Sequence, residues 1–191
     1  MSLRKLKAGI APFFRRHEPK SPFRLNLKQG LGAFLAIVTL GLLLDNTGLP
    51  FLIAPFGAST LLLFGRPSSP LAQPINLFGG YFIGGSVAFA TAALFPGVLW
   101  ATAVSLGIGL VLMTLLRVTH PPAGAIPLIA FAGEVDLLML AEAMAFGSAA
   151  LMVLALIWHR VPPRQAYPSG PDEYADAIHR EELEDRGGFG L

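Results

Sequence analysis

The chain has 191 residues, of which 53% are hydrophobic and 14% are charged, with a mean hydropathy of +0.60. Soluble domains carry roughly 25% charged residues, so this composition excludes an ordinary water-soluble globular protein and indicates a membrane protein. The formal charge is only +2, and the absence of cysteine excludes disulfides and cysteine-ligated metals. The length leaves room for one membrane domain with a tail at each end.

The N-terminal segment, residues 1–26, is strongly basic. Eight of the fourteen Lys and Arg residues lie within the first 28 positions, where Glu18 is the only acid. The positive-inside rule therefore places this end in the cytoplasm, and the segment is too long and basic for a signal peptide. Its cations suit the headgroups of the lipid bilayer better than nucleic acid, because few aromatic residues are interleaved with them.

Four apolar stretches follow that are long enough to cross the hydrocarbon core, which takes about 20 residues. They are residues 30–44 with their flanks, 77–94, 98–116 and 137–158. Two shorter apolar stretches carry prolines and glycines that break helices, residues 49–65 and 121–132. These stretches predict an all-α membrane protein with a transmembrane domain over residues 27–160.

The two short stretches share a motif. Pro55-Phe56-Gly57-Ala58 in the first corresponds to Pro122-Ala123-Gly124-Ala125 in the second, 67 residues later. The same offset roughly superposes the long stretches of the two halves, so each half is a helix, a Pro/Gly-broken helix and a helix. Because three crossings per half is an odd number, the second half enters the membrane in the opposite orientation to the first. We predict a helical bundle of two inverted three-segment repeats, a design in which transporters bind their substrate at the repeat interface.

Loop charges distinguish six crossings from four crossings with two re-entrant loops. With six crossings, Arg66, Arg117 and Arg160 all fall on the cytoplasmic side. The acids of the other loops then fall outside: Asp45, Glu134 and Asp136. This agreement with the positive-inside rule favours six crossings and places both termini in the cytoplasm.

The C-terminal segment, residues 161–191, begins with prolines and then becomes acidic. This composition is typical of a solvated cytoplasmic tail, and docking of a partner is the alternative.

The starts of the two broken segments are candidate binding sites. Proline suits the first turn of a helix, and the small residues after it leave backbone N–H donors uncovered. If the halves are inverted, these two helix starts can meet near the midplane and enclose a small anion. The structural alternative is that the residues only provide kinks and close packing. The candidate substrate-binding residues are Pro55, Gly57, Ala58, Ser59, Thr60, His120, Pro121, Pro122, Ala123, Gly124 and Ala125.

His120 is the only histidine of the apolar region. It could donate to the substrate, carry a proton or cap backbone carbonyls. The hydroxyls of Ser59 and Thr60 could bind the substrate or bond to their own helix.

The stretch 77–94 contains two glycine pairs, Gly79-Gly80 and Gly84-Gly85. Small residues at this spacing let helices approach closely, either within the bundle or between the subunits of a homo-oligomer. At the start of this helix, Gln73 and Asn76 could cap the helix or line an entrance.

Three motifs carry a resemblance to a known family. Thr119-His120-Pro121-Pro122, together with Ala54-Pro55-Phe56-Gly57 and Ser68-Ser69-Pro70-Leu71, resembles the HPP family of integral membrane proteins over residues 27–160. The chain departs from the pattern at Ala123, where glycine is expected, and at Tyr81, where histidine is often found. The resemblance implies four transmembrane helices as the family is usually described. It also implies nitrite transport, with which plant chloroplast and cyanobacterial members are associated.

These features favour a protein of the bacterial inner membrane that transports a small inorganic monovalent anion, nitrite being the substrate that the resemblance implies. An anion-selective channel has the same parts and stays an alternative. An enzyme is not expected, because the apolar region has no paired carboxylates, no Ser-His-Asp set and no metal-ligand spacing; no cofactor or metal is expected either. A structural or signalling membrane module would show strong features in its tails and featureless spans, the reverse of this pattern.

Overall fold

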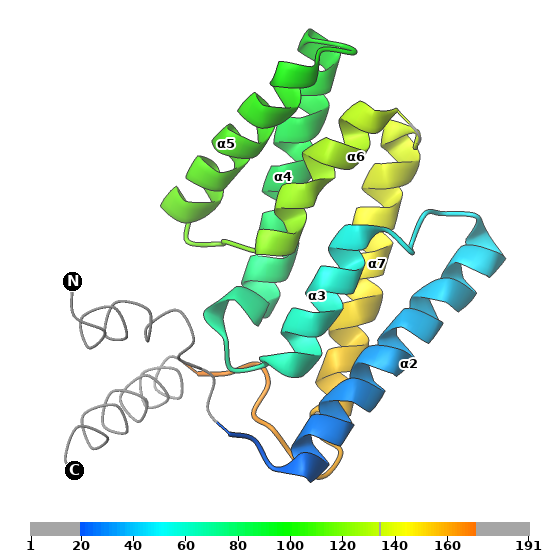
Figure 1. The fold of residues 1–191 in the computed structure, drawn as a ribbon, viewed down its shortest axis with the longest axis vertical. Helices are drawn as coiled ribbons and strands as arrows, with labels where there is room; N and C mark the ends of the chain where they lie inside the picture. The colour runs from blue at the N-terminus through cyan, green and yellow to red at the C-terminus, as the bar shows by residue number, and fades with distance from the viewer. Residues whose placement is uncertain (1–19, 134, 171–191) are drawn as a thin grey trace, which may run out of the picture.

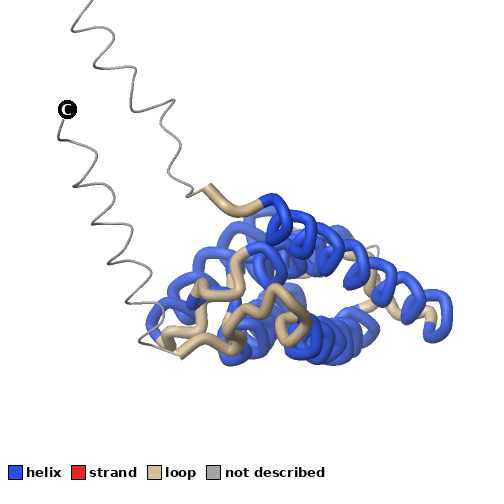
Figure 2. Tube along the Cα trace, turned by 90° about the horizontal axis from the view of Figure 1, so that it is seen from below, coloured by secondary structure: helices blue, strands red, loops and turns tan. Residues whose placement is uncertain are grey.

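The structure is a computed structural model that describes residues 20–133 and 135–170. Most of the predicted basic segment 1–26, the loop residue Glu134 and most of the predicted acidic tail lie outside the described residues. Within the described ranges the fold is helical and has no strand, which confirms the predicted all-α class (Figures 1 and 2).

The helices follow one another with short connections. In chain order they are α2 (Phe23–Thr47), α3 (Ala54–Gly65), the 3-10 turn η1 (Pro70–Ala72), α4 (Pro74–Leu94), α5 (Leu99–Leu115), the 3-10 turn η2 (Pro121–Ala125), α6 (Ile126–Ala132) and α7 (Leu137–Trp158). Three of them are long and apolar enough to cross a membrane: α2, α4 and α7, with 25, 21 and 22 residues.

The sequence predicts the stretch 98–116 as one of four that are long enough to cross the membrane, but its helix, α5, is one of the shorter apolar helices. It has 17 residues, fewer than the roughly 20 that cross a hydrocarbon core. The helix ends at Leu115, and Arg117 then takes a backbone conformation with φ 58°. In this left-handed region the chain leaves the helix direction, and it turns back toward α4 as η2.

Local sequence explains where several helices begin and end. Gly48 ends α2 with φ 73°, and its N–H donates to the carbonyl of Leu44 at 2.7 Å, as expected of a glycine that follows a helix. The helix α3 has Pro55 in its first turn, where proline lacks only an N–H that would have no helical partner. The carboxylate of Asp136 caps α7 by accepting hydrogen bonds from the next turn.

The helix α4 is the centre of the bundle and contacts α5, α6, α7, η1 and η2. On the other side, α2 covers α3 and α7. Figure 1 shows that α3 and the segment η2–α6 begin at the same level, partway along the bundle, and run in opposite directions from there. Residues of α3 and η2 are in contact, so the two predicted Pro/Gly segments are neighbours in space.

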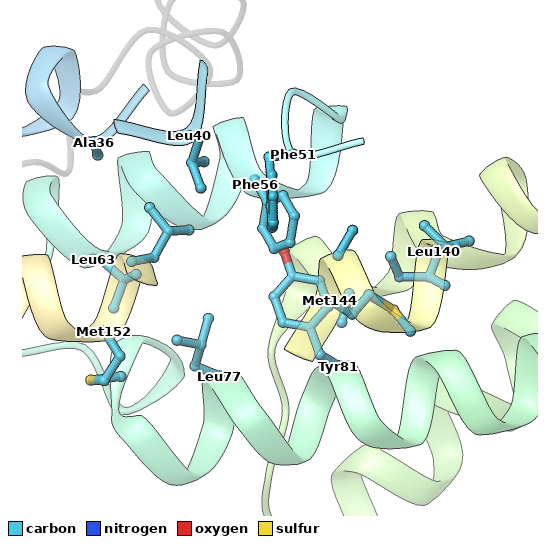
Figure 3. Packing of buried hydrophobic residues seen from close by; sticks show 14 of the residues in the cluster. Ala36, Leu40, Phe51, Phe56, Leu63, Leu77, Tyr81, Leu140, Met144 and Met152 are labelled. Atoms are coloured by element: carbon cyan, nitrogen blue, oxygen red, sulfur yellow. The ribbon is translucent and has the colours of Figure 1, made fainter. Parts of the chain in front are cut away.

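The apolar core lies mainly between α3, α4 and α7. Phe56 and Leu63 of α3 are fully buried, as is Leu77 of α4, and they gather around the centre of the bundle together with Tyr81 and Met144 (Figure 3). Outward-facing positions are also apolar, for example Leu99 with 87% exposure. A surface of this kind suits contact with lipid, which solvates apolar side chains without cost.

The residues that follow α7, orange in Figure 1, lie at one end of the bundle. We call residues 161–170 the C-terminal strap. The ammonium group of Lys28 donates to the carbonyls of Val161 at 2.7 Å and Pro163 at 2.6 Å. The hydroxyl of Tyr167 donates to the carbonyl of Ala72 at 2.7 Å. These hydrogen bonds hold the first ten residues of the predicted tail against the bundle, although most of their side chains are exposed.

Candidate functional site

Three polar side chains meet where α3, α4 and the start of η2 converge; we call Ser59, Tyr81 and His120 the polar cluster. Ser59 Oγ lies 2.8 Å from Tyr81 Oη and 2.8 Å from His120 Nε2. The other ring nitrogen, His120 Nδ1, lies 2.9 Å from the carbonyl oxygen of Leu71 in η1. One continuous chain of hydrogen bonds thus joins both Pro/Gly segments to α4 and η1.

The partners determine the direction of these bonds in the neutral state. The Leu71 carbonyl can only accept, so Nδ1 of His120 carries the hydrogen. Nε2 of a neutral imidazole is then an acceptor, and Ser59 donates to it. Ser59 Oγ in turn accepts from the hydroxyl of Tyr81. Every hydrogen of the polar cluster is therefore already bonded within the protein.

The polar cluster is sealed from its surroundings. Ser59 and His120 are 0% exposed and Tyr81 is 2% exposed. The ring of Tyr81 packs against the rings of Phe56 and His120, with centroids 5.3 Å and 5.4 Å away. Figure 3 shows the Tyr81 hydroxyl pointing from α4 toward α3. Polar groups buried this deeply are costly unless they are paired, which explains the complete bonding.

Glycines of α4 let the second Pro/Gly segment approach. A Cβ atom at Gly80 would collide with the Cβ of His120, and one at Gly84 would lie 2.8 Å from the carbonyl oxygen of Ala123. The side-chain amide of Asn76 donates to the carbonyl of Thr119 at 2.9 Å and holds the same segment. The glycine face of α4 is thus occupied within the chain, which is one of the two predicted uses; a homo-oligomer stays a prediction.

Cavities border both sides of η2. The first, which we call the motif groove, has a volume of about 590 Å³. It is lined by Ala54, Pro55, Ala58, Leu61, Leu62 and Arg66 of α3 with its cap, and by Pro121, Pro122 and Ala125 of η2. A second cavity of about 370 Å³ lies between η2, α4 and α5, and its lining includes His120, Ala123, Gly124 and Ser105. Five candidate residues from the two segments therefore share the motif groove: Pro55, Ala58, Pro121, Pro122 and Ala125.

Four of the seven predicted backbone donors, those of Ala58, Ser59, Thr60 and Ala123, are not free, which corrects that part of the prediction. Because α3 begins at Ala54, residues 58–60 lie beyond its first turn, where each N–H bonds to a carbonyl four residues earlier. In η2, Pro121 and Pro122 have no N–H, and the N–H of Ala123 donates to the carbonyl of His120 at 3.0 Å. The hydrogen-bonded side chains of Ser59, Tyr81 and His120 are therefore the main polar feature of this site.

The remaining candidates have individual surroundings. Thr60 is 1% exposed and its hydroxyl has no hydrogen-bond partner. A Cβ atom at Gly57 or at Gly124 would meet no other atom within 4 Å. These two glycines therefore border open space, in contrast to the tightly packed Gly80 and Gly84.

Sequence reasoning missed two members of the site. Tyr81 was noted only as a departure from a family pattern, and Leu71 was part of a quoted motif without a role. A tyrosine inside an apolar stretch is a usable signal, because its buried hydroxyl needs a partner. Within the described residues, no group of three or more His, Cys, Asp or Glu side chains could hold a metal ion.

Comparison with known proteins adds the family. The sequence matches the family described as HPP, transmembrane region, over residues 18–168. A transmembrane protein of Dictyostelium discoideum is 29% identical over 184 residues, which cover 87% of this chain and 59% of that protein. A second transmembrane protein of the same organism is 29% identical over 150 residues, covering 72% and 53%. The chain thus spans little more than half the length of these relatives. No solved structure matches it.

Proposed function

The chain belongs to the HPP transmembrane family, and on that premise we propose that it transports a small monovalent anion, with nitrite as the leading substrate. The observation that carries the proposal is the buried polar cluster at the meeting point of the two Pro/Gly segments. Polar and ionisable groups inside a membrane domain are costly and mark substrate or ion pathways. A cluster used only for packing could have been replaced by apolar residues.

The arrangement of the segments supports an inverted repeat as the frame of this site. The offset of 67 residues between Pro55 and Pro122 carries the bounds of α3, Ala54–Gly65, onto Pro121–Ala132. The two segments also run in opposite directions from neighbouring starts (Figure 1). In transporters with inverted repeats, substrate sites lie between the two halves.

The chemistry of the polar cluster suits a small anion. Hydroxyl and imidazole hydrogens are donors of moderate strength, and none of the three side chains carries a fixed charge. Such a site can bind an anion weakly enough to release it, which conduction and transport both need. The motif groove lies between the two Pro/Gly segments, and Arg66 lines it, where a cation raises the local anion concentration.

We propose the bacterial inner membrane as the location, with both termini in the cytoplasm. The basic residues of the N-terminal part support this orientation through the positive-inside rule.

The test is flux into liposomes that contain the purified protein, measured separately for nitrite, nitrate, formate and chloride. We expect nitrite uptake above that of empty vesicles. No flux of any of these anions, in either direction and across pH, would overturn the transport function.

Variants at the two open glycines test the location. Gly57→Leu and Gly124→Leu place a side chain where the structure has no atom within 4 Å of a Cβ, so we expect normal folding and oligomer size but no flux. Gly107→Leu on α5, equally open, is the matched control and should transport normally. Normal flux in both test variants would show that the Pro/Gly motifs serve helix packing and not substrate binding.

A further inference from the structure

His120 is the one histidine of the polar cluster. While its imidazole is neutral, every hydrogen of the cluster is donated to an acceptor within the protein. There are three hydrogens, those of Tyr81 Oη, Ser59 Oγ and His120 Nδ1. Three acceptors receive them: Ser59 Oγ, His120 Nε2 and the Leu71 carbonyl. An anion that reached this closed cluster would find no free donor. Something must change before the site can bind an anion.

Protonation of His120 is the change that this geometry allows. With a hydrogen on Nε2 the imidazole becomes a donor at both nitrogens, so Ser59 must accept from the ring and turn its own hydrogen elsewhere. The polar cluster then has four hydrogens but only three acceptors of its own, namely Ser59 Oγ, Tyr81 Oη and the Leu71 carbonyl. One hydroxyl hydrogen and one positive charge are left over in a buried site.

An anion supplies both missing partners, an acceptor and a negative charge. We propose that the protein carries one proton with each anion, and that His120 is the residue that takes up the proton. The inference rests on the proposed anion transport and adds the proton as a second substrate. A neutral histidine leaves the site closed, and a protonated histidine without an anion leaves a buried unpaired charge, which is strongly unfavourable. Each ligand therefore requires the other.

Among the described residues that bond to or pack against the His120 ring, none carries a negative charge that could replace the anion. The groups that face the ring are Ser59 from α3, Leu71 from η1, and Gly80 and Tyr81 from α4. Only Tyr81 among them can titrate, and a tyrosine is neutral near pH 7. The nearest cation along the chain is Arg117, and its side chain is exposed.

The proton balance is simple. A proton from the aqueous phase on one side binds the lone pair of Nε2, and the anion accepts the hydrogen bond that becomes free. On the opposite side the anion leaves, the Nε2–H bond breaks and the proton returns to water. The polar cluster resumes its neutral arrangement, and one turnover moves no net charge. Two cavities border the closed cluster: His120 lines one of them, and Tyr81 lines another of about 430 Å³ between α4 and α7.

Electroneutrality gives the sharpest test. Proteoliposomes receive nitrate or nitrite outside, while a potassium gradient with valinomycin sets the membrane potential. For a proton-coupled carrier with one proton per anion, we expect the final accumulation to follow the pH gradient and to ignore the potential. For an uncoupled channel or carrier, about 100 mV would change the accumulation of a monovalent anion about 50-fold. Flux with that dependence on potential overturns the coupling but leaves anion transport standing, whereas no flux at all removes the proposed function.

A dye that reports the internal pH provides the second measurement. Anion uptake by the wild-type protein should acidify the lumen in proportion to the anion taken up, after subtraction of empty vesicles. The variant His120→Gln keeps a hydrogen-bonding side chain but cannot take up a proton, so we expect loss of both acidification and pH-driven accumulation. The matched control is His159→Gln, another buried histidine bonded to a backbone carbonyl, that of Leu63. If His120→Gln still couples uptake to the pH gradient, the assignment to His120 is wrong; should that variant not fold, the wild-type dependence on potential still decides.

Discussion

Ser59 and His120 lie 61 positions apart in the chain, yet a hydrogen bond of 2.8 Å joins Ser59 Oγ to Nε2 of His120. One residue belongs to the first Pro/Gly segment and the other precedes the second. The bond is buried, so it forms only when α3 and η2 pack against α4 in one relative position. It therefore depends on the correct packing of the two halves of the molecule and also forms part of the site.

Ser59→Ala removes this link without adding volume. We expect nitrite uptake in liposomes to fall to the background level, because His120 loses its bond to the first segment. The free energy of unfolding should decrease by about 1 to 3 kcal/mol, since the ring nitrogen and the Tyr81 hydroxyl stay buried without partners. Thr39→Ala is the control, because that hydroxyl bonds only to Leu35 of its own helix. Equal behaviour of the two variants in flux would contradict a role for the polar cluster.

Gly80→Ala should be much more damaging than its size suggests. The added methyl group would collide with His120, and overpacking of this kind costs about 1 to 3 kcal/mol. Gly107→Ala on α5 has open space around the new Cβ and should stabilise its helix by about 0.5 to 1 kcal/mol. Unfolding in detergent micelles measures both changes, and a neutral Gly80→Ala would show that the segment before η2 can shift away from α4.

The stability of the protein should fall on acidification, in part through His159, which follows α7. Burial lowers the pKa of this imidazole below its usual value of about 6.5, the charge of Lys28 acts in the same direction, and the hydrogen bond to Leu63 opposes both. The folded state therefore disfavours the proton. The contribution to stability is complete above about pH 6.5 and is lost as the pH falls toward the lower folded-state pKa.

The measurement for His159 is the midpoint of thermal unfolding in detergent between about pH 8 and pH 5. His159→Gln should give a flatter curve than the wild type, because glutamine does not titrate. His120 is present in both proteins, so the difference isolates His159. Parallel curves would mean that His159 takes up its proton equally well in the folded and unfolded chains.

Variants of two tyrosines distinguish an effect on transport, at Tyr81 of the polar cluster, from an effect on stability alone, at Tyr167 of the C-terminal strap. Tyr81→Phe removes the hydroxyl that bonds to Ser59, and we expect uptake to fall about tenfold or more, the effect of one lost hydrogen bond of about 1.4 kcal/mol. Tyr167→Phe removes the bond to Ala72 at 2.7 Å and should lower only stability, by about 1 kcal/mol. Flux and unfolding are measured for each variant; a larger flux defect in Tyr167→Phe would place the C-terminal strap in the transport path.

Much of the fold follows from local features of the chain. The long apolar stretches predict α2, α4 and α7 because crossing a bilayer requires length and hydrophobicity, and both can be counted in a sequence. Pro55 predicts the start of α3 to within one residue, since proline is tolerated only in the first turn of a helix. The predicted stretch 98–116 extends one residue beyond α5 at each end, since hydropathy does not define the first and last helical residues.

The sequence predicted the position of the candidate site in the chain but not the hydrogen bonds that form it. The candidate list contained Ser59 and His120, because polar residues beside helix breakers in an apolar chain are unusual. It assigned the binding to backbone donors, an inference that depended on the first helical residue and on which N–H groups find partners. Those details are decided by the contacts of Ala123 and by the start of α3 at Ala54.

The sequence by itself determined that the protein is a helical membrane protein of the HPP family and that its two Pro/Gly segments are its unusual features. Composition, apolar length and backbone restrictions are properties of neighbouring residues, so they can be read without a structure. Only the tertiary structure decided that Tyr81 joins Ser59 and His120, that Gly80 makes room for His120 and that every hydrogen of the cluster is bonded within the protein. These relationships connect residues 22 and 61 positions apart, and they exist because helix packing brings α3, α4 and η2 to one place.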